Sequence, residues 1–417
     1  MLGEILNSIL FVLQLVFWFI GFYYTITSMF GLIEKFKNKK DKLYMPEKKF
    51  AIFIPAHNEE VVISSIVENL KHINYPKELF DVFVVADNCT DNTADTAAKA
   101  GAKVLVRFDD TDKGKGHALK WAFETVLFSR HKNYKYDAAV IFDADNLVAK
   151  EFLWEMNNKL CAGHKVVQGF IDSKNPNDSW ITLAYSVSFW SVNRLFQSAR
   201  CYLGLSNEIG GTGFCMDVQV LKKMGWEATS LAEDLEFTAK LVLNGFKVAW
   251  APNAVIYDEK PLTLMQSWKQ RRRWMQGFAD VCSRYFFELL KKGFKEGDLA
   301  AIDCAIYTLQ PYVLILGGIM LLLPFANILF FEGDLFILTT NISTVFFFYI
   351  GMIQLLLLPI SLIVEKRFTM KMLLFYPAYA VFCLTWIPIA IEGIVKMKNK
   401  DWNHTLHTRR LSIQEIE

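Results

Sequence analysis

Apolar residues divide the 417-residue chain into an apolar start, a mixed centre and an apolar C-terminal part. Ile5–Ile33 is almost entirely apolar and long enough to cross about 30 Å of hydrocarbon. A cleaved signal peptide has a basic start and a shorter apolar run, whereas Glu4 precedes this one and the basic residues follow it, at Lys35, Lys37, Lys39 and Lys40. We therefore expect residues 1–40 to form an uncleaved membrane anchor and the next residues to be cytoplasmic.

Short apolar runs alternate with helical patterns over residues 45–260. Four of these runs predict buried parallel strands, at Phe50–Pro55, Val82–Ala86, Lys103–Phe108 and Ala138–Phe142. The stretches between them predict helices, at Glu59–His72, Thr93–Ala100 and Lys115–Ser129. Such alternation is typical of a doubly wound α/β domain, in which ligands bind beyond the carboxyl ends of the strands.

The C-terminal part carries the signature of a membrane protein. Residues 261–300 mix basic and aromatic residues at helical spacing, which favours helices lying at the membrane surface. Three apolar stretches in residues 301–396 are each long enough to span a bilayer, at Ala301–Phe331, Leu335–Val364 and Met372–Val395. The polar tail, residues 397–417, is basic, so we expect it to be cytoplasmic, with the third stretch re-entrant or interfacial.

The composition agrees with a membrane segment joined to a water-soluble domain. Hydrophobic residues make up 53% of the chain and charged residues 21%, whereas soluble domains have about 45–50% and about 25%. A net charge of +2 gives no basic excess of the kind that nucleic-acid binding requires. The seven cysteines form no C-x-x-C pair, which indicates reduced thiols and neither a disulfide framework nor a zinc site.

Polar residues follow the first two predicted strands directly. The first strand runs into Ala56, His57 and Glu59, a strand-to-helix turn that suits a phosphate or a nucleoside, although Glu59 would also serve at a helix start. The second strand ends at Asp87. This residue comes too early to cap a helix that begins near Thr93, so we expect Asp87 to contact a ligand.

Two further clusters suit phosphate and metal. Lys115 lies in the glycine-containing segment Asp112–Leu119, which would approach a phosphate closely; a plain surface loop is the alternative, and the P-loop spacing is absent. Asp143 and Asp145 directly follow the buried strand Ala138–Phe142. Two carboxylates so close would repel each other without a cation, and Mg²⁺ binds through one or two carboxylates plus phosphates. This pair predicts a divalent-metal site.

Three clusters remain. The glycine-dense turn at residues 209–214 contains Gly211 and Thr212 and allows a substrate to approach the backbone. Glu233 and Asp234 open a predicted helix, where they would also complement its dipole; we expect only one of them to point into a site, since neighbouring side chains on a helix diverge. The last cluster, also readable as a basic membrane-surface patch, contains Gln270, three consecutive arginines ending at Arg273, and Trp274.

The order of these motifs over residues 45–280 resembles the inverting family 2 glycosyltransferases. Within that family it is similar to the membrane-embedded synthases of cellulose, hyaluronan, chitin and poly-N-acetylglucosamine. The resemblance implies an α/β GT-A fold, a Rossmann-like nucleotide-sugar-binding domain joined to α-helical transmembrane segments. It also implies a nucleotide-sugar donor, usually a UDP-sugar, and Mg²⁺ or Mn²⁺ as cofactor.

The resemblance assigns a role to each candidate residue. Asp234 would be the general base for the acceptor hydroxyl, and Asp145 with Asp143 would hold the metal. The nucleotide-sugar site would comprise Ala56, His57, Glu59, Asp87, Lys115, Asp143, Asp145 and Arg273. The acceptor and diphosphate site would comprise Gly211, Thr212, Glu233, Gln270 and Trp274.

Our leading hypothesis is a metal-dependent, multi-pass enzyme of the cell membrane with a cytoplasmic catalytic domain, which builds a β-linked polysaccharide from a UDP-sugar. Few predicted spans are available to line a polymer conduit, so an accessory membrane subunit or a second copy would assist. The alternative is addition of one sugar to a lipid acceptor, because ceramide-type glucosyltransferases have a similar Gln-x-x-Arg-Trp motif. An inactive assembly subunit would have lost a carboxylate, yet all are present, at Asp87, Asp143, Asp145 and Asp234.

Overall fold

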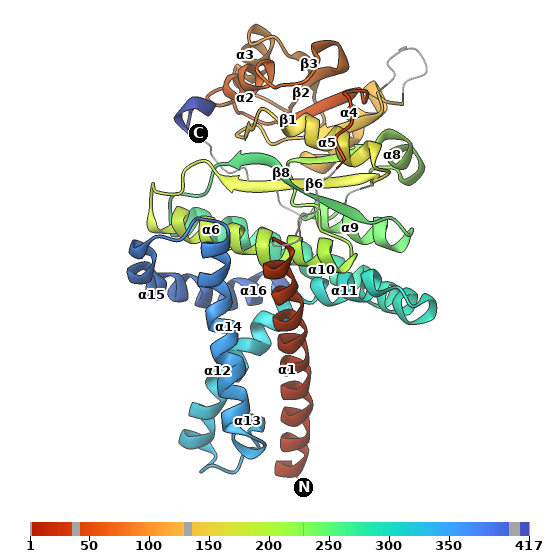
Figure 1. Ribbon diagram of the computed structural model, residues 1–417. Coiled ribbons are helices and arrows are strands. Elements are labelled where there is room, and N and C mark those ends of the chain that lie inside the picture. The colour runs from red at the N-terminus through yellow and green to blue at the C-terminus, as the bar shows by residue number, and fades with distance from the viewer. Residues whose placement is uncertain (1, 36–41, 129–135, 228, 400–408, 417) are drawn as a thin grey trace.

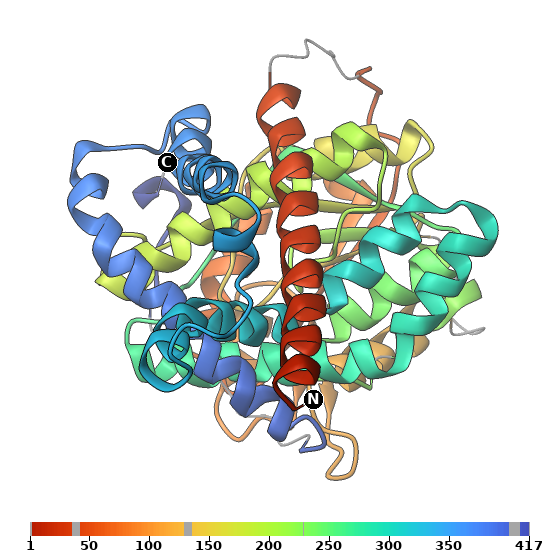
Figure 2. The ribbon, with the colours of Figure 1, turned by 90° about the horizontal axis from the view of Figure 1, so that it is seen from below.

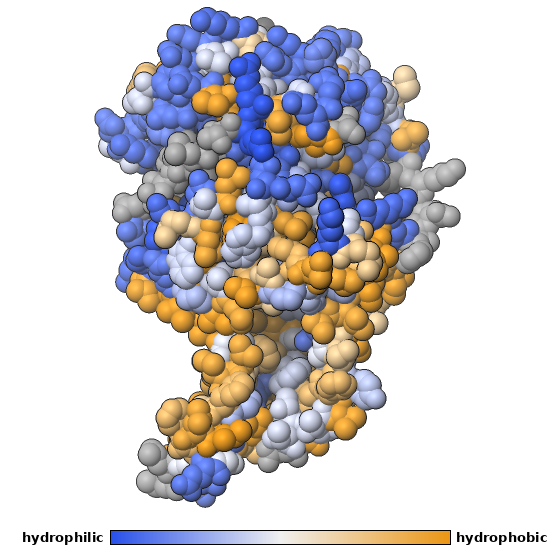
Figure 3. Space-filling model, turned by 90° about the vertical axis from the view of Figure 1, so that its left-hand side faces the viewer, coloured by the Kyte–Doolittle hydropathy of each residue, from blue (hydrophilic) through white to orange (hydrophobic). Residues whose placement is uncertain are grey.

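The computed structural model describes residues 2–35, 42–128, 136–227, 229–399 and 409–416. Lys37, Lys39 and Lys40, which are expected to mark the cytoplasmic side of the anchor, lie outside these ranges, as does the first part of the tail. Figure 1 shows an α/β domain above a band of helices, from which a stem of long helices extends. In the view of Figure 3 the α/β domain is mostly hydrophilic at its surface and the stem mostly hydrophobic.

An eight-stranded sheet forms the centre of the α/β domain, in the order β3-β2-β1-β4-β7-β6-β8-β5. Its strands are β1 (Phe50–Ala56), β2 (Phe80–Asp87), β3 (Lys103–Arg107), β4 (Ala138–Ile141), β5 (Leu147–Val148), β6 (Val166–Ser173), β7 (Phe214–Asp217) and β8 (Val248–Asp258). The four predicted strands are confirmed as a parallel set, β3-β2-β1-β4. Since β7 runs antiparallel to β4 and β6, the complete sheet is mixed.

Helices cover both faces of this sheet because β1 is apolar on both sides. Phe50 and Ile52 belong to one core cluster, while Ala51 and Phe53 belong to another. The first cluster is covered by α2 (Ile63–Lys71), α3 (Thr93–Lys99) and α5 (Phe152–Cys161). The second is covered by α4 (Lys115–Val126), α8 (Val218–Met224) and α9 (Glu233–Leu243). A short helix, η1 (Lys77–Leu79), precedes β2.

The helix predicted from Glu59 begins only at Ile63. Residues 60–62 form a turn in place of the first predicted helical residues, and Asn58, just before them, has a left-handed conformation with φ of 54°. The helix predicted to end at Ser129 stops at Val126, and Ser129 lies outside the described ranges. The turn thus separates the end of β1 from the start of α2.

The band of helices contains the residues predicted to lie at the membrane surface. It comprises α6 (Trp180–Val192), the π-helix η2 (Asn193–Ser198), α7 (Ala199–Leu203), α10 (Leu264–Glu296) and α11 (Leu299–Thr308). The prediction of one apolar span over Ala301–Phe331 was wrong. The chain breaks at Leu309, and α11 packs its apolar side against α9 and α10 within the band.

The stem consists of α1 (Leu2–Glu34), α12 (Gln310–Phe330), α13 (Leu338–Asn341) and α14 (Thr344–Val364). Within the described ranges, four segments are long and apolar enough to cross a membrane: Gly3–Glu34, Gln310–Phe330, Thr344–Val364 and Met370–Val395. The last comprises α15 (Met370–Leu384) and α16 (Trp386–Val395), which run across the direction of the stem in Figures 1 and 2. This orientation is consistent with the expected re-entrant or interfacial placement of the third apolar stretch. The depth of α15 and α16 in a bilayer stays a prediction.

One buried arginine joins the stem to the band. Arg194 of η2 pairs with Glu34 at the end of α1, at 3.1 Å, and with Glu365 just after α14. Close packing accompanies this contact, because a β-carbon on Gly31 of α1 would lie 2.1 Å from the carbonyl oxygen of Arg194. Both α1 and α14 therefore end against η2 of the band.

The C-terminal tail returns to the α/β domain. Its last helix, η3 (Ile413–Glu415), buries Ile413, and residues 410–415 face Ser65 and His72 of the α2 region. The tail and the α/β domain consequently lie on the same side of the stem.

Candidate active site

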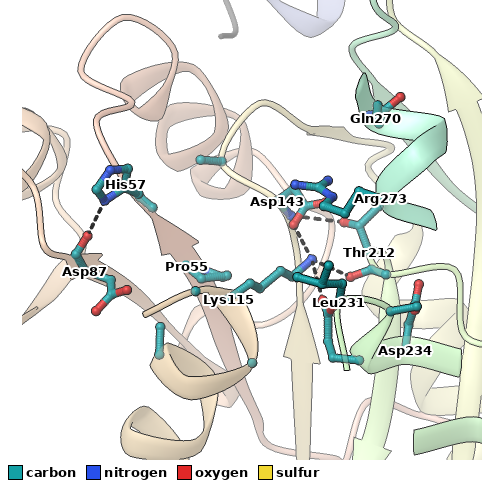
Figure 4. Close-up of a pocket in the computed structure, with 18 of the residues that line it drawn as sticks. Pro55, His57, Asp87, Lys115, Asp143, Thr212, Leu231, Asp234, Gln270 and Arg273 are labelled. Carbon is teal, nitrogen blue, oxygen red and sulfur yellow. Dashed lines mark hydrogen bonds and ion pairs between the residues drawn. The ribbon is translucent and has the colours of Figure 1, made fainter. Parts of the chain in front are cut away.

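A cleft of about 280 Å³ lies at the carboxyl ends of β1, β2 and β4, and all the predicted site residues line it. Figure 4 shows His57 and Asp87 at one end, Lys115 and Asp143 in the middle, and Asp234 with α10 at the other. Residues that sequence reasoning missed also line the cleft, among them Phe189 and Glu259. Glu259 directly follows β8, so the rule of polar residues at strand ends would have found it had β8 been predicted.

Asp87 is held at the end of β2 by a partner on the neighbouring strand. The parallel register places Asp87 opposite Arg107, and the Arg107 Nη1 to Asp87 Oδ1 distance is 2.6 Å. His57 Nδ1 donates to the carbonyl oxygen of Asp87 at 2.8 Å. Both side chains of the ion pair are nearly buried, so this end of the cleft is rigid.

The two carboxylates predicted to hold a metal both follow β4 and line the cleft. The backbone N–H of Asp143 donates to Thr212 Oγ1 at 3.0 Å, and the Asp143 side chain is 35% exposed. Asp145 is 3% exposed, and its Oδ2 accepts from the backbone N–H of Glu259 at 3.0 Å. Two carboxylates that line one cleft fit a hard divalent cation that shares its coordination with phosphates.

Lys115 occupies the middle of the cleft. Its ammonium contacts the Asp143 carboxylate, donates to the carbonyl oxygen of Gly211 at 2.7 Å and lies 3.9 Å from Glu233. Burial would lower the pKa of Lys115, but the carboxylates around it outweigh burial and raise this pKa. Lys115 therefore stays a cation and can neutralise a negatively charged ligand.

Asp234 lies in the first turn of α9. Its Oδ1 accepts from the backbone N–H of Leu235 at 2.7 Å, while Oδ2 lies near Gly211. Burial, reinforced by the neighbouring charge of Glu233, raises the pKa of the Asp234 carboxyl to about 7. A carboxylate with this pKa can accept a proton near neutral pH, as a general base must.

The expectation that only one of the two neighbouring carboxylates would reach the site was wrong. Both Glu233 and Asp234 line the cleft. The cleft surrounds the start of α9, so Glu233 meets it on the side of Lys115 and Asp234 on the side of Gly211.

The three consecutive arginines of α10 point to three different environments. Arg271 is fully buried against the rings of Phe382 and Trp386, and Arg272 pairs with Glu392 at 2.9 Å. Arg273 lines the cleft with Gln270 and Trp274. Arg271 and Arg272 thus join α10 to the α15–α16 segment, and the run is not simply a basic membrane-surface patch.

Residues 46–277, more than half of the chain, match the family described as glycosyltransferase like family 2. The chain belongs to this family. It is 26% identical to the probable glycosyltransferase YdaM of Bacillus subtilis over 84% of each chain. It is also 26% identical to poly-beta-1,6-N-acetyl-D-glucosamine synthase of Staphylococcus aureus over 69% of each chain.

The fold of this family 2 glycosyltransferase is similar to that of a solved structure. Mannosyltransferase PcManGT from Pyrobaculum calidifontis, in complex with GDP-Man and Mn²⁺, has a TM-score of 0.61 at 16% identity. The match covers 95% of this chain and 100% of that one. The predicted family, GT-A fold and enzyme class are therefore confirmed, and the four apolar segments fit a membrane protein with a soluble catalytic domain.

Proposed function

We propose that this enzyme transfers a sugar, with inversion, from a UDP-sugar to the end of a growing β-linked polysaccharide at a membrane. The observation that carries the proposal is the position of Asp234, a half-buried carboxyl of raised pKa, in the same cleft as Lys115 and the Asp143–Asp145 pair. Similarity to poly-beta-1,6-N-acetyl-D-glucosamine synthase supports a polymeric product.

The donor would lie along the carboxyl ends of the strands. Ala56, His57, Glu59 and Asp87 would surround the nucleoside, with Asp87 held rigid by Arg107. Asp143 and Asp145 would hold Mg²⁺ or Mn²⁺, whose chemistry there is neutralisation of the charge that develops on the diphosphate.

Cations of the chain would assist departure of the diphosphate. The Lys115 ammonium lies in the middle of the cleft, and Arg273 approaches it from α10. Fixed positive groups in a site that excludes water stabilise a developing anion more strongly than the same groups do in solution. Lys115 would exchange its contact with Asp143 for the diphosphate when the donor binds.

Asp234 would take the proton of the acceptor hydroxyl as that oxygen attacks the anomeric carbon. The bond from the anomeric carbon to the diphosphate breaks as the new glycosidic bond forms, so UDP leaves from the opposite face and the configuration inverts. One base is sufficient for this reaction, and no covalent intermediate is required. Glu233, Gly211, Thr212, Gln270 and Trp274 would shape the acceptor end.

The acceptor end of the cleft borders the helices that face the membrane. Trp274 stacks on Trp386 of α16, with ring centroids 6.3 Å apart, and contacts Tyr185 of α6 edge-on. Such aromatic surfaces suit sugar rings and apolar chains alike. We propose that α1, α12 and α14 cross the bilayer, with the catalytic domain cytoplasmic and an accessory subunit or second copy completing the conduit.

Product analysis tests this function. Membranes containing the enzyme are incubated with a panel of radiolabelled nucleotide sugars, and products are separated by size and by extraction into organic solvent. We expect a water-soluble polymer from a UDP-sugar, formed by the parent enzyme and absent with Asp234→Asn. A product confined to lipid carrying one or two sugars would establish the lipid-acceptor alternative.

A further inference from the structure

Glu236 is a buried carboxylate that lies two residues after Asp234 on α9 and does not line the cleft. Its side chain is 1% exposed. Glu236 Oε2 accepts the backbone N–H groups of Thr229 and Ser230, both at 2.8 Å. Glu236 Oε1 receives Lys240 at 2.9 Å and two donors of α10, Arg284 at 3.0 Å and Tyr285 at 3.1 Å.

These contacts make Glu236 a permanent anion. Burial alone would raise the pKa of Glu236, but the hydrogen bonds from Arg284 and Lys240 hold it at about 2. A buried carboxylate that accepts several charge-assisted hydrogen bonds has one well-defined position. Glu236 is thus a fixed point between α9, α10 and the loop that precedes α9.

All three of these elements contribute to the cleft. The loop of residues 229–232 lines it, α9 carries Asp234, and the first turns of α10 carry Arg273 and Trp274. Loop and α10 also touch directly, because a β-carbon on Gly277 would lie 2.4 Å from the β-carbon of Ala232. Any displacement of α10 at Glu236 would therefore move the loop that lines the cleft beside Asp234.

We propose that Glu236 is a positioning residue of the transfer reaction, which fixes Asp234 relative to the loop at residues 229–232 and to the α10 motif. The proposal rests on the role of Asp234 as the base. It predicts effects on the base and the acceptor, and none on the donor, whose site at β1, β2 and β4 makes no contact with Glu236.

Glu236→Gln keeps the shape of the side chain and removes its charge. We expect kcat to fall about 10- to 100-fold, the range for a small misplacement of a catalytic group. The charged groups that act on Asp234 are Glu233, Lys115 and Glu208. All remain, but a loosened loop admits water to Asp234 and lowers its pKa, so the acid limb of the pH–rate profile should move below about 7. The KM for the donor should not change.

The matched control is Asp280→Asn. Asp280 pairs with the same Arg284 at 2.7 Å, but the pair lies within α10. Loss of the Asp280–Arg284 ion pair should leave kcat and the pH–rate profile unchanged. If Glu236→Gln cannot be purified, the double variant Arg284→Met/Tyr285→Phe removes the α10 contacts, keeps those to Thr229 and Ser230, and should shift the limb in the same direction.

Two outcomes separate this proposal from the assignment of the base. An unmoved acid limb in Glu236→Gln, with only the yield of folded enzyme reduced, would overturn the positioning role while Asp234→Asn stays inactive. Near-normal turnover of Asp234→Asn would instead overturn the assignment of the base, and the positioning role with it. An equal shift in Asp280→Asn would show that any loss of an Arg284 contact has the same effect, which also contradicts the proposal.

Discussion

The α-carbon of Gly211 lies so close to Asp234 that a β-carbon placed on it would be 3.2 Å from Asp234 Oδ2. Gly211 also has φ of 80°, a conformation that residues with a side chain rarely adopt. The glycine turn at residues 209–214 and the start of α9 therefore pack closely together, and both line the cleft.

Gly211→Ala should lower kcat by displacing the Asp234 carboxylate, with little effect on donor binding. Gly245→Ala is the control, because Gly245 has φ of 79° and no atom near its missing β-carbon. Both variants carry the same backbone strain of about 1 kcal/mol, so both should unfold at a similarly lowered temperature, but only Gly211→Ala should lose turnover. Equal turnover in the two would show that the contact with Asp234 is unimportant.

Asp234→Asn should lower the transfer rate by about 10²- to 10⁴-fold, the usual loss when a general base is removed. Affinity for the UDP-sugar, measured by equilibrium binding, should stay unchanged. In the parent enzyme the rate should fall as the pH decreases through about 7, because protonated Asp234 cannot accept the acceptor proton. Loss of donor binding with the rate intact would place Asp234 in another role.

Asp234→Asn should also stabilise the folded protein at neutral pH. The pKa of an unfolded aspartate is about 3.9, whereas that of folded Asp234 is raised to about 7. The folded state thus binds the proton more tightly, and the stability this provides is present at acid pH and lost as the pH rises through 7. The Tm of Asp234→Asn should exceed that of the parent by an amount that grows from about pH 4 to about pH 7 and stays constant above it. A difference independent of pH would contradict the raised pKa.

Removal of divalent metal should abolish transfer. EDTA should inactivate the enzyme, and Mg²⁺ or Mn²⁺ should restore it, because the diphosphate cannot leave without charge neutralisation. Asp145→Ala should be inactive at any metal concentration, whereas Asp95→Ala, at an exposed position of α3, should behave as the parent does. Full activity in EDTA would exclude the metal-dependent mechanism.

Topology is testable with single cysteines in sealed vesicles. Gln414→Cys should react only from the cytoplasmic side, since the tail packs near α2 of the catalytic domain. Glu332→Cys, in the turn between α12 and α14, should react only from the outer side. Labelling of both from one side would mean that α12 and α14 do not cross as a pair.

Sequence reasoning recovered β1, β2 and β4 because each is a continuous apolar run, buried on both faces, that ends in polar residues. It missed β5, which is only two residues long, and β6 and β7, whose apolar runs are broken by polar residues or glycine. It also missed β8, which contains Pro252 and Asn253 and shifts register against β6. Short or irregular strands carry little periodicity, and neighbours distant in the chain decide their pairing.

The candidate site was predictable as a list of residues and not as a set of contacts. Each carboxylate follows a recognisable strand or opens a recognisable helix. The partner of Asp87, in contrast, is Arg107, which depends on the register between β2 and β3. Two of the donors to Glu236, Arg284 and Tyr285, come from α10, nearly fifty residues further along the chain, and no local sequence pattern predicts these contacts.

The pairing of Arg194 with Glu34 makes the N-terminal helix α1 a structural part of the enzyme as well as a membrane anchor. A simple membrane anchor can be removed without effect on the domain that it anchors. Helix α1, in contrast, provides one of the two carboxylates around the buried Arg194 guanidinium and packs Gly31 directly on η2. Removal of residues 1–40 would leave Arg194 with Glu365 as its remaining carboxylate partner of the two and would expose the surface of η2 on which α1 packs. A water-soluble version of this enzyme therefore requires redesign of the η2 surface that contacts α1, as well as removal of α1 itself.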